Sequence, residues 1–129
     1  MGITFNHTIV AAKDRRESAD YFTDVFGLPA AKEFGHFLAV SLEHGASLDF
    51  AQAPADQDVH PQHYGFLVTE PEFDAIYARI LQRGQKHWAD PRGEREGEIN
   101  HHDGGRGVYF QDPSGHYLEI ITRPYGSGG

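Results

Sequence analysis

Hydrophobic and polar positions follow two kinds of pattern in the first half of the chain, one typical of strands and one typical of a helix. Short apolar runs, typical of strands, are found at residues 5–10, 36–42 and 47–52. A stretch with the period of a helix lies after the first run, with apolar positions at Ala19, Phe22, Val25 and Phe26. Asp14 precedes it as an N-cap with Glu17 three residues on, and Gly27 ends it. This half predicts a strand, a helix, and two or three strands.

The second half repeats the same order. Its strand-like runs are residues 63–69, 85–90, 107–112 and 116–122. Its helical stretch has apolar residues at Phe73, Ile76, Tyr77, Ile80 and Leu81. Thr69 and Pro71 mark the start of this helix, and Gly84 marks its end. The repeat predicts an α+β fold in which one domain, residues 1–129, contains two βαβββ modules.

The boundaries of the modules follow from this repeat. We expect the first module at residues 3–53, a linker at 54–62 and the second module at 63–124. Residues 125–129, which end in GSGG, are expected to form a flexible tail.

Aligning the last strands of the two halves brings a pair of carboxylates into register. The stretch SLDFA matches YLEII, so Asp49 corresponds to Glu119, while His7 and His63 stand near the start of each half. Strand alternation turns the apolar neighbours of Glu119 toward the helix and leaves Glu119 and His63 on the far face. An enclosed carboxylate is costly without a partner, so this face calls for a cation.

Composition narrows the class of protein. The chain has no cysteine, which excludes disulfides, thiolate metal sites and cysteine nucleophiles. Its net charge of −8 argues against nucleic acid and anionic membrane as partners. We expect a cytoplasmic protein, because no apolar run reaches the length of a membrane span and no signal-like start is present.

Two stretches, NHTIVAAKDRRESADYFTDVFGLP and GRGVYFQDPSGHYLEI, resemble the vicinal oxygen chelate superfamily. That group includes glyoxalase I, fosfomycin and bleomycin resistance proteins, and extradiol dioxygenases. The resemblance implies an open cup of two curled sheets with the helices on the outer face. It also implies one divalent metal per chain, a small-molecule substrate, and a homodimer that in many relatives completes the cup.

By the same resemblance, the metal ligands are His7, His63 and Glu119, with Asp49 as a possible fourth. Two imidazoles and a carboxylate suit Fe, Mn, Zn or Ni and leave coordination positions open. Four ligands favour an isomerase or lyase of the glyoxalase type, whereas three leave a ring-cleaving dioxygenase open. The alternative is a bleomycin-resistance-like protein that sequesters a small molecule at a dimer cleft. A fosfomycin-type thiol transferase ranks lower, because no basic cluster is evident.

The remaining candidate residues are found in one polar loop, at Tyr109, and at histidines scattered along the chain. Residues 90–107 are polar, charged and rich in glycine, and predict either a surface loop or a lid that brings His101, His102 or Arg106 to the substrate. Tyr109 is expected to line the cup. His116 is expected to be structural, because it faces away from Glu119. Solvated surface positions are expected for His36, His44, His60 and His87.

Overall fold

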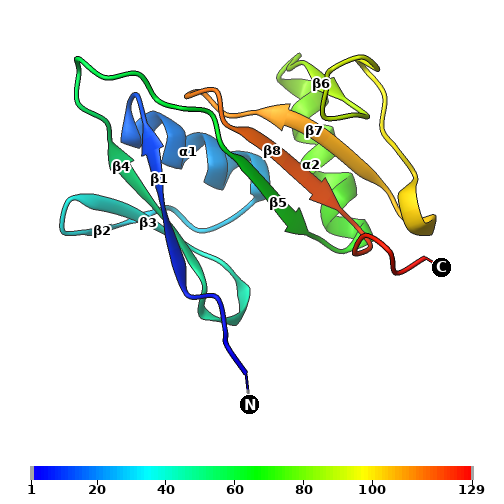
Figure 1. Cartoon of the computed structure of the whole chain (residues 1–129), viewed down its shortest axis with the longest axis horizontal. Coiled ribbons are helices and arrows are strands. Elements are labelled where there is room, and N and C mark those ends of the chain that lie inside the picture. Colours follow the sequence, from blue (N-terminus) through cyan, green and yellow to red (C-terminus); the bar gives the residue numbers. More distant parts are fainter. Residues whose placement is uncertain (1, 129) are drawn as a thin grey trace. The chain divides into compact units, whose positions relative to one another are not determined.

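The computed structural model describes residues 2–128, and the chain divides into two compact units between His60 and Pro61. The first unit consists of β1 (His7–Ala12), α1 (Arg15–Phe26), β2 (Lys32–Phe34), β3 (Phe37–Ser41), a 3-10 turn (Glu43–Gly45) and β4 (Ser47–Gln52). The second consists of β5 (His63–Leu67), α2 (Glu70–Gln82), β6 (His87–Trp88), a 3-10 turn (His102–Gly104), β7 (Gly107–Gln111) and β8 (Tyr117–Ile121). The predicted α+β fold with two βαβββ modules is confirmed (Figure 1).

Each unit forms one mixed sheet of four strands with the same topology. The strand orders are β1-β4-β3-β2 and β5-β8-β7-β6. In each sheet the first strand pairs in parallel with the last, and the remaining neighbours are antiparallel. The parallel pairing places the first and last strands of a module side by side, so that side chains from both can meet on one face.

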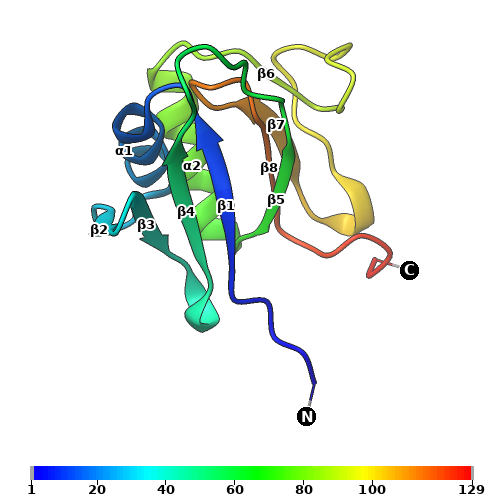
Figure 2. The ribbon, with the colours of Figure 1, turned by 60° about the vertical axis from the view of Figure 1, so that its left-hand side comes forward.

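The helices begin where their capping residues predict. Asp14 accepts a hydrogen bond from the Glu17 backbone N–H, and α1 ends at Gly27 with φ 71°. Thr69 and Glu72 form a complete capping box at the start of α2. In each unit the helix covers one face of its own sheet: α2 lies behind β7 and β8 in Figure 1, and α1, which contacts β1, β3 and β4, lies beside β4 in Figure 2.

Alternating side chains from the strands and the apolar stripes of the helices form the cores. The largest fully buried side chains of the first unit are Phe22, Val25, Leu38 and Val40, and those of the second are Phe73, Ile80, Phe110 and Ile120. Leu48 and Phe50 of β4 and Leu118 and Ile120 of β8 are buried, as alternation predicts. The opposite faces of the two sheets are thereby left to the odd-numbered residues of β4 and β8.

Several strand boundaries differ from the prediction. β1 begins at His7 rather than residue 5, and β5 ends at Leu67 before the capping residues of α2. β2 was not predicted, because its three residues are all exposed and carry no periodic apolar signal. Within residues 2–128, no helix is long and apolar enough to cross a membrane.

Candidate metal centre

His63 and Glu119 come together on the second sheet, on the face opposite α2. His63 is the first residue of β5, and Glu119 lies at the centre of β8, paired with Gly65 of β5 on one side and Tyr109 of β7 on the other. The His63 Nε2–H donates a hydrogen bond to Glu119 Oε1 over 2.8 Å. The predicted shared face of His63 and Glu119 is therefore confirmed within this unit.

Glu119 is a buried carboxylate whose two oxygens have separate partners. The residue is only 4% exposed, whereas the His63 side chain is 50% exposed. Tyr125 donates its hydroxyl to Oε2, and the hydroxyl of Tyr109 lies 3.1 Å from that of Tyr125. Burial, and then the hydrogen bond and negative charge of Glu119, raise the pKa of Tyr109 well above its usual value. Tyr109 therefore stays protonated and acts as a hydrogen-bond donor.

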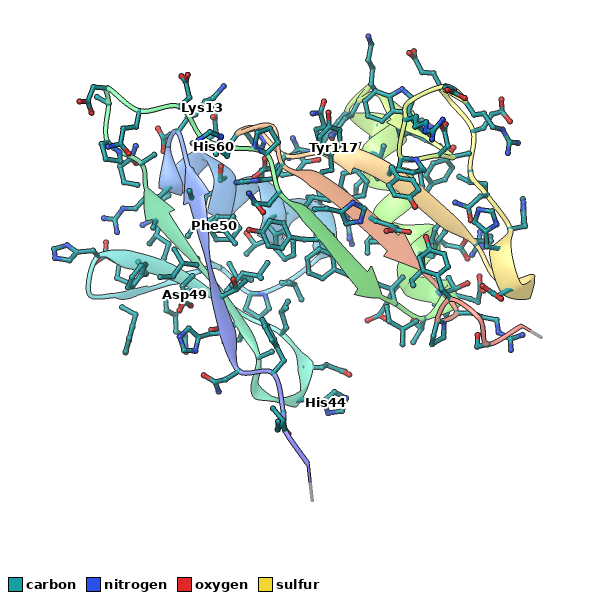
Figure 3. All side chains as sticks on the ribbon, viewed as in Figure 1. Lys13, His44, Asp49, Phe50, His60 and Tyr117 are labelled. Carbon is teal, nitrogen blue, oxygen red and sulfur yellow. The ribbon has the colours of Figure 1, made fainter. Side chains whose placement is uncertain are left out.

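The first sheet carries His7 and Asp49 on its equivalent face. In the parallel β1–β4 pair, His7 is paired with Ser47. Asp49 lies two residues after Ser47 on β4 (Figure 3). Both line an open hollow of about 430 Å³. His7 Nδ1 donates to the Asn6 side-chain oxygen over 2.7 Å, which leaves the lone pair of the neutral ring on Nε2. Ser47 donates to Asp49 Oδ1 over 3.0 Å.

The donor atoms fit a divalent metal, although the predicted ligands are not gathered in one place. Within residues 2–128, no group of three or more His, Asp or Glu side chains forms a metal cluster. The structure brings His63 and Glu119 together in the second unit, and His7 belongs to the first. A buried carboxylate beside an imidazole is a donor pair that such metals prefer, and a cation would offset the cost of burying Glu119.

The loop between β6 and β7 places its histidines at the surface. His101 and His102 are both exposed. The ring of His102 lies 6.3 Å from the ring of Tyr125, measured between centroids. His102 is therefore connected to the Glu119 cluster through Tyr125, whereas His101 has no such contact within residues 2–128.

Arg106 lies on the helix side of the second sheet. Its guanidinium makes ion pairs of 2.7 Å with Glu70 and 2.8 Å with Asp74 of α2. It also stacks over the Phe73 ring, with 4.4 Å between Cζ and the ring centroid. Strand alternation explains this placement, because the next residue, Gly107, is on the Glu119 face. Arg106 therefore connects the start of β7 to α2, on the face of the sheet opposite Glu119.

A second hollow, of about 330 Å³, lies on the Glu119 face of the second sheet. It reaches from Tyr109 and Gln111 to Trp88 and the loop at Arg92. Its aromatic and amide side chains could contact a small organic molecule, and its volume falls in the usual range for ligand pockets.

Tyr125 was missed by reasoning from sequence. It stands between Pro124 and the GSGG tail, a context that predicts no fixed structure. The one feature of the sequence that could have indicated a role for Tyr125 is that it is a lone aromatic residue among small and polar residues. Its partner, Glu119, is found only when the chain beyond β8 folds back.

Two βαβββ modules, each with a histidine on its first strand and a carboxylate on its last, define a glyoxalase-like protein. The family model of the Glyoxalase/Bleomycin resistance protein/Dioxygenase superfamily matches residues 4–120. The chain therefore belongs to this superfamily, as its sequence motifs predicted.

Three individual proteins are similar to the chain over most of its length. The solved structure of oxidase ChaP-H2 is 52% identical, with a TM-score of 0.95, and the match covers 100% of both chains. Oxidase ChaP-H1 is 54% identical with a TM-score of 0.93, over 97% of this chain and 99% of that one. Glutathione transferase FosA of Serratia marcescens is 29% identical over 124 residues, covering 91% of this chain and 79% of the relative.

Proposed function

We propose that this protein is a metal-dependent enzyme that oxidises a small oxygenated molecule. The observation that carries the proposal is the pair of His63 and Glu119, joined over 2.8 Å on a sheet face that the helix leaves open. The Glu119 side chain is 5% exposed, and a carboxylate so enclosed is stabilised strongly by a cation. The similarity to two oxidases at 52% and 54% identity supports the same class of reaction.

The proposed ligands are His7, His63 and Glu119, which would hold one divalent Fe, Mn, Zn or Ni per chain. Any of these metals would polarise neighbouring oxygens of the substrate, and Fe or Mn would also supply the redox chemistry of an oxidase, which Zn lacks. His7 already has the tautomer with its lone pair on Nε2, since Nδ1 donates to Asn6. His63 Nε2 and Glu119 Oε1 are adjacent, and both would face the metal.

We place Asp49 outside the ligand set. One of its oxygens accepts a hydrogen bond from Ser47, and the residue is only half-buried. Three protein ligands leave enough open positions for both a bidentate substrate and an oxidant. This choice favours an oxidase or ring-cleaving dioxygenase over a lyase or isomerase of the glyoxalase type.

The substrate is proposed to bind on the same sheet faces as the ligands. Tyr109, a neutral phenol at the edge of the second hollow, would donate a hydrogen bond to an oxygen of the substrate or to Glu119. His102 stands next to Tyr125 and would approach from the loop. His101 is proposed to contact the substrate only when the loop closes over it. The active form is proposed to be a homodimer.

A thiol transferase is the second candidate, because the chain is 29% identical to glutathione transferase FosA. The second hollow contains Lys86 and Arg92, but Asp90 and Glu96 line it as well. Its cations are therefore balanced, which disfavours an anionic substrate such as a phosphonate.

Metal binding tests the proposal most directly. Purified protein should contain one divalent metal per chain, and metal-free protein should bind Fe²⁺, Ni²⁺ or Zn²⁺ in a calorimetric titration. Glu119→Gln keeps the shape but removes the charge, so its metal affinity should fall by about 100-fold or more, beyond the effect of outer partners. Glu98→Gln, an exposed carboxylate paired with Arg95, is the control and should bind as wild type.

Reaction class is tested by oxygen consumption with catechols and related vicinal diols. Turnover with uptake of oxygen supports the oxidase. Turnover that requires glutathione and takes up no oxygen supports the transferase. Tight binding of a small molecule without turnover of any substrate supports the drug-sequestering alternative.

A further inference from the structure

Residues 123–128, here called the strap, follow β8 and are fastened to the loop between β6 and β7. The backbone N–H of Gly126 donates to Asp103 Oδ2 over 3.1 Å, and that of Gly128 donates to Asp103 Oδ1 over 3.2 Å. A single carboxylate therefore holds two points of the strap. Asp103 has a positive φ of 57°, which Asp tolerates better than most residues and which marks a specific loop conformation.

The strap brings the hydroxyl of Tyr125 to a buried charge. Tyr125 is 53% exposed, so burial of its ring does not explain its position. Its hydroxyl donates to Oε2 of Glu119, while Oε1 of the same carboxylate accepts from His63. Tyr109, 3.1 Å from Tyr125, completes a chain of two phenols.

We propose that Tyr125 is a positioning residue for the metal ligand Glu119, delivered by the strap and fastened by Asp103. The inference rests on the proposed metal function. The two carboxylate oxygens have separate roles: Oε1 lies beside His63 Nε2 and would face the metal with it, while Oε2 stays with Tyr125. A hydrogen bond to the outer oxygen orients the carboxylate and limits its rotation, as outer partners of metal ligands commonly do.

This arrangement also gives the metal-free protein a stable form. Without a cation, the charge of Glu119 depends on hydrogen-bond donors, and His63 and Tyr125 supply them. Binding of a metal would remove the donation from His63 but preserve that from Tyr125. The strap thus serves the same carboxylate in both states, and the loop that contains Asp103 is linked to the metal site through it.

Three variants test the role of Tyr125. Tyr125→Phe removes only the hydroxyl, and its metal affinity should fall by about 10–100-fold. Asp103→Asn tolerates the same φ but loses one accepting oxygen, so it should lower affinity less. The matched control is Tyr77→Phe, which removes a phenol bonded to His87 Nε2 over 3.0 Å elsewhere in the second unit and should bind as wild type.

A double variant separates positioning from general damage. Because Asp103 acts through Tyr125, Tyr125→Phe combined with Asp103→Asn should bind metal no more weakly than Tyr125→Phe alone. Affinities are measured by competition with a chromophoric chelator, and the Co²⁺ absorption spectrum should shift in Tyr125→Phe but not in Tyr77→Phe.

Hydrogen exchange provides a readout without metal. The amides of Gly126 and Gly128 should be protected in wild type and exchange faster in Asp103→Asn and Tyr125→Phe. Unprotected amides in wild type, or wild-type affinity in Tyr125→Phe, overturn the inference while leaving the metal function intact. A wild-type protein that binds no divalent metal instead overturns the proposed function, and the positioning role with it, even if the strap is protected.

Discussion

Asp49 and Glu119 occupy equivalent positions in the two modules but have different surroundings. On the parallel neighbouring strand, Asp49 is paired with Ile9, whereas Glu119 is paired with Gly65. A Cβ atom added at Gly65 would lie 3.6 Å from Glu119 Oε1, so the glycine gives the longer carboxylate open space beside it. Glu119 is buried and has three polar neighbours, and Asp49 is half-buried beside Ser47. The two modules thus share the same register, but the two acids have different burial and different hydrogen-bond partners.

Asp49→Asn should therefore have little effect on metal affinity. We expect a change of no more than about threefold, in contrast to the large loss in Glu119→Gln, because a residue outside the ligand set contributes only weak electrostatic attraction. Parallel calorimetric titrations of the two variants provide the comparison. A loss in Asp49→Asn as large as that in Glu119→Gln would identify a fourth ligand and favour lyase or isomerase chemistry.

Strand alternation predicted a structural role for His116 but did not predict its hydrogen bond to the segment before β5. It was expected to be structural, and it is 1% exposed, with Nδ1 accepting a hydrogen bond from the Gln62 backbone N–H over 3.0 Å. That contact fixes the residue before His63. His87, by contrast, was expected at the solvated surface and is buried against Tyr77. Its burial depends on a partner ten residues earlier on α2, which strand alternation does not reveal.

Truncating His116 should destabilise the protein substantially. His116→Ala removes the acceptor for a buried N–H and leaves a cavity, so the free energy of unfolding should fall by about 3 kcal/mol. Urea denaturation at neutral pH measures this change. His60→Ala, at an exposed position in the linker, should stay within about 0.5 kcal/mol of wild type. Equal stability of the two variants would mean that His116 is not part of the core.

At the scale of elements, local signals were sufficient where the partners lie close in sequence. The helix caps at Asp14 and Thr69 and the strand β4 were predicted from a few neighbouring residues. β2 was not predicted, because its three exposed residues carry no apolar pattern and the strand is defined by its pairing with β3. The strap was not either, since its amides bond to Asp103 more than 20 residues away. Arg106 was predicted as a possible lid residue from the polar, glycine-rich loop around it, and its ion pairs with Glu70 and Asp74 join residues more than 30 positions apart in the sequence.

The capping box of α2 should make a measurable and pH-dependent contribution. Hydrogen bonds from the backbone and side chain of Thr69 lower the pKa of Glu72. Because the folded-state pKa is below the unfolded one, this stabilisation is present above the ordinary Glu range near pH 4.3 and is lost as pH falls through the lowered value. Thr69→Ala should cost about 1 kcal/mol at pH 7, and its difference from wild type should shrink below about pH 4.

Urea denaturation at pH 7 and at pH 3.5 measures both effects. Thr4→Ala, an exposed threonine outside any helix or strand, is the matched control and should leave stability unchanged at both values. A cost in Thr69→Ala that is the same at both pH values would show that the hydroxyl alone caps the helix, without a contribution from the Glu72 carboxylate.

At the scale of the whole molecule, duplication explains why the sequence was so informative. Two modules with the same strand order give two independent views of one pattern, and each confirmed the face assigned to the other. Duplication does not reveal the different surroundings of Asp49 and Glu119. It also does not reveal the strap, which follows β8 and has no counterpart after β4, where the chain continues into the linker.

Exposed apolar side chains of the first unit lead to the prediction of a homodimer. Four large ones, Ile3, Phe5, Ile9 and Phe34, are each more than half exposed, with Phe34 at 70%. Phe34 also lines the hollow that contains His7, so a partner chain there would cover apolar surface beside a proposed ligand. Large exposed apolar residues near a site commonly mark an interface, and a two-fold axis would bury the same residues on both chains.

Light scattering at micromolar concentration should therefore report twice the 14.4 kDa mass of the chain. Phe34→Glu places a charge in the proposed interface and should shift the protein toward single chains, because burying an unpaired charge is costly. Leu81→Glu, an equally apolar exposed residue on α2, should leave the mass unchanged. Metal affinity measured on the same samples then shows whether the site depends on the partner, since Phe34→Glu should weaken it only if the second chain contributes. A wild-type protein that runs as a single 14.4 kDa species would contradict the dimer.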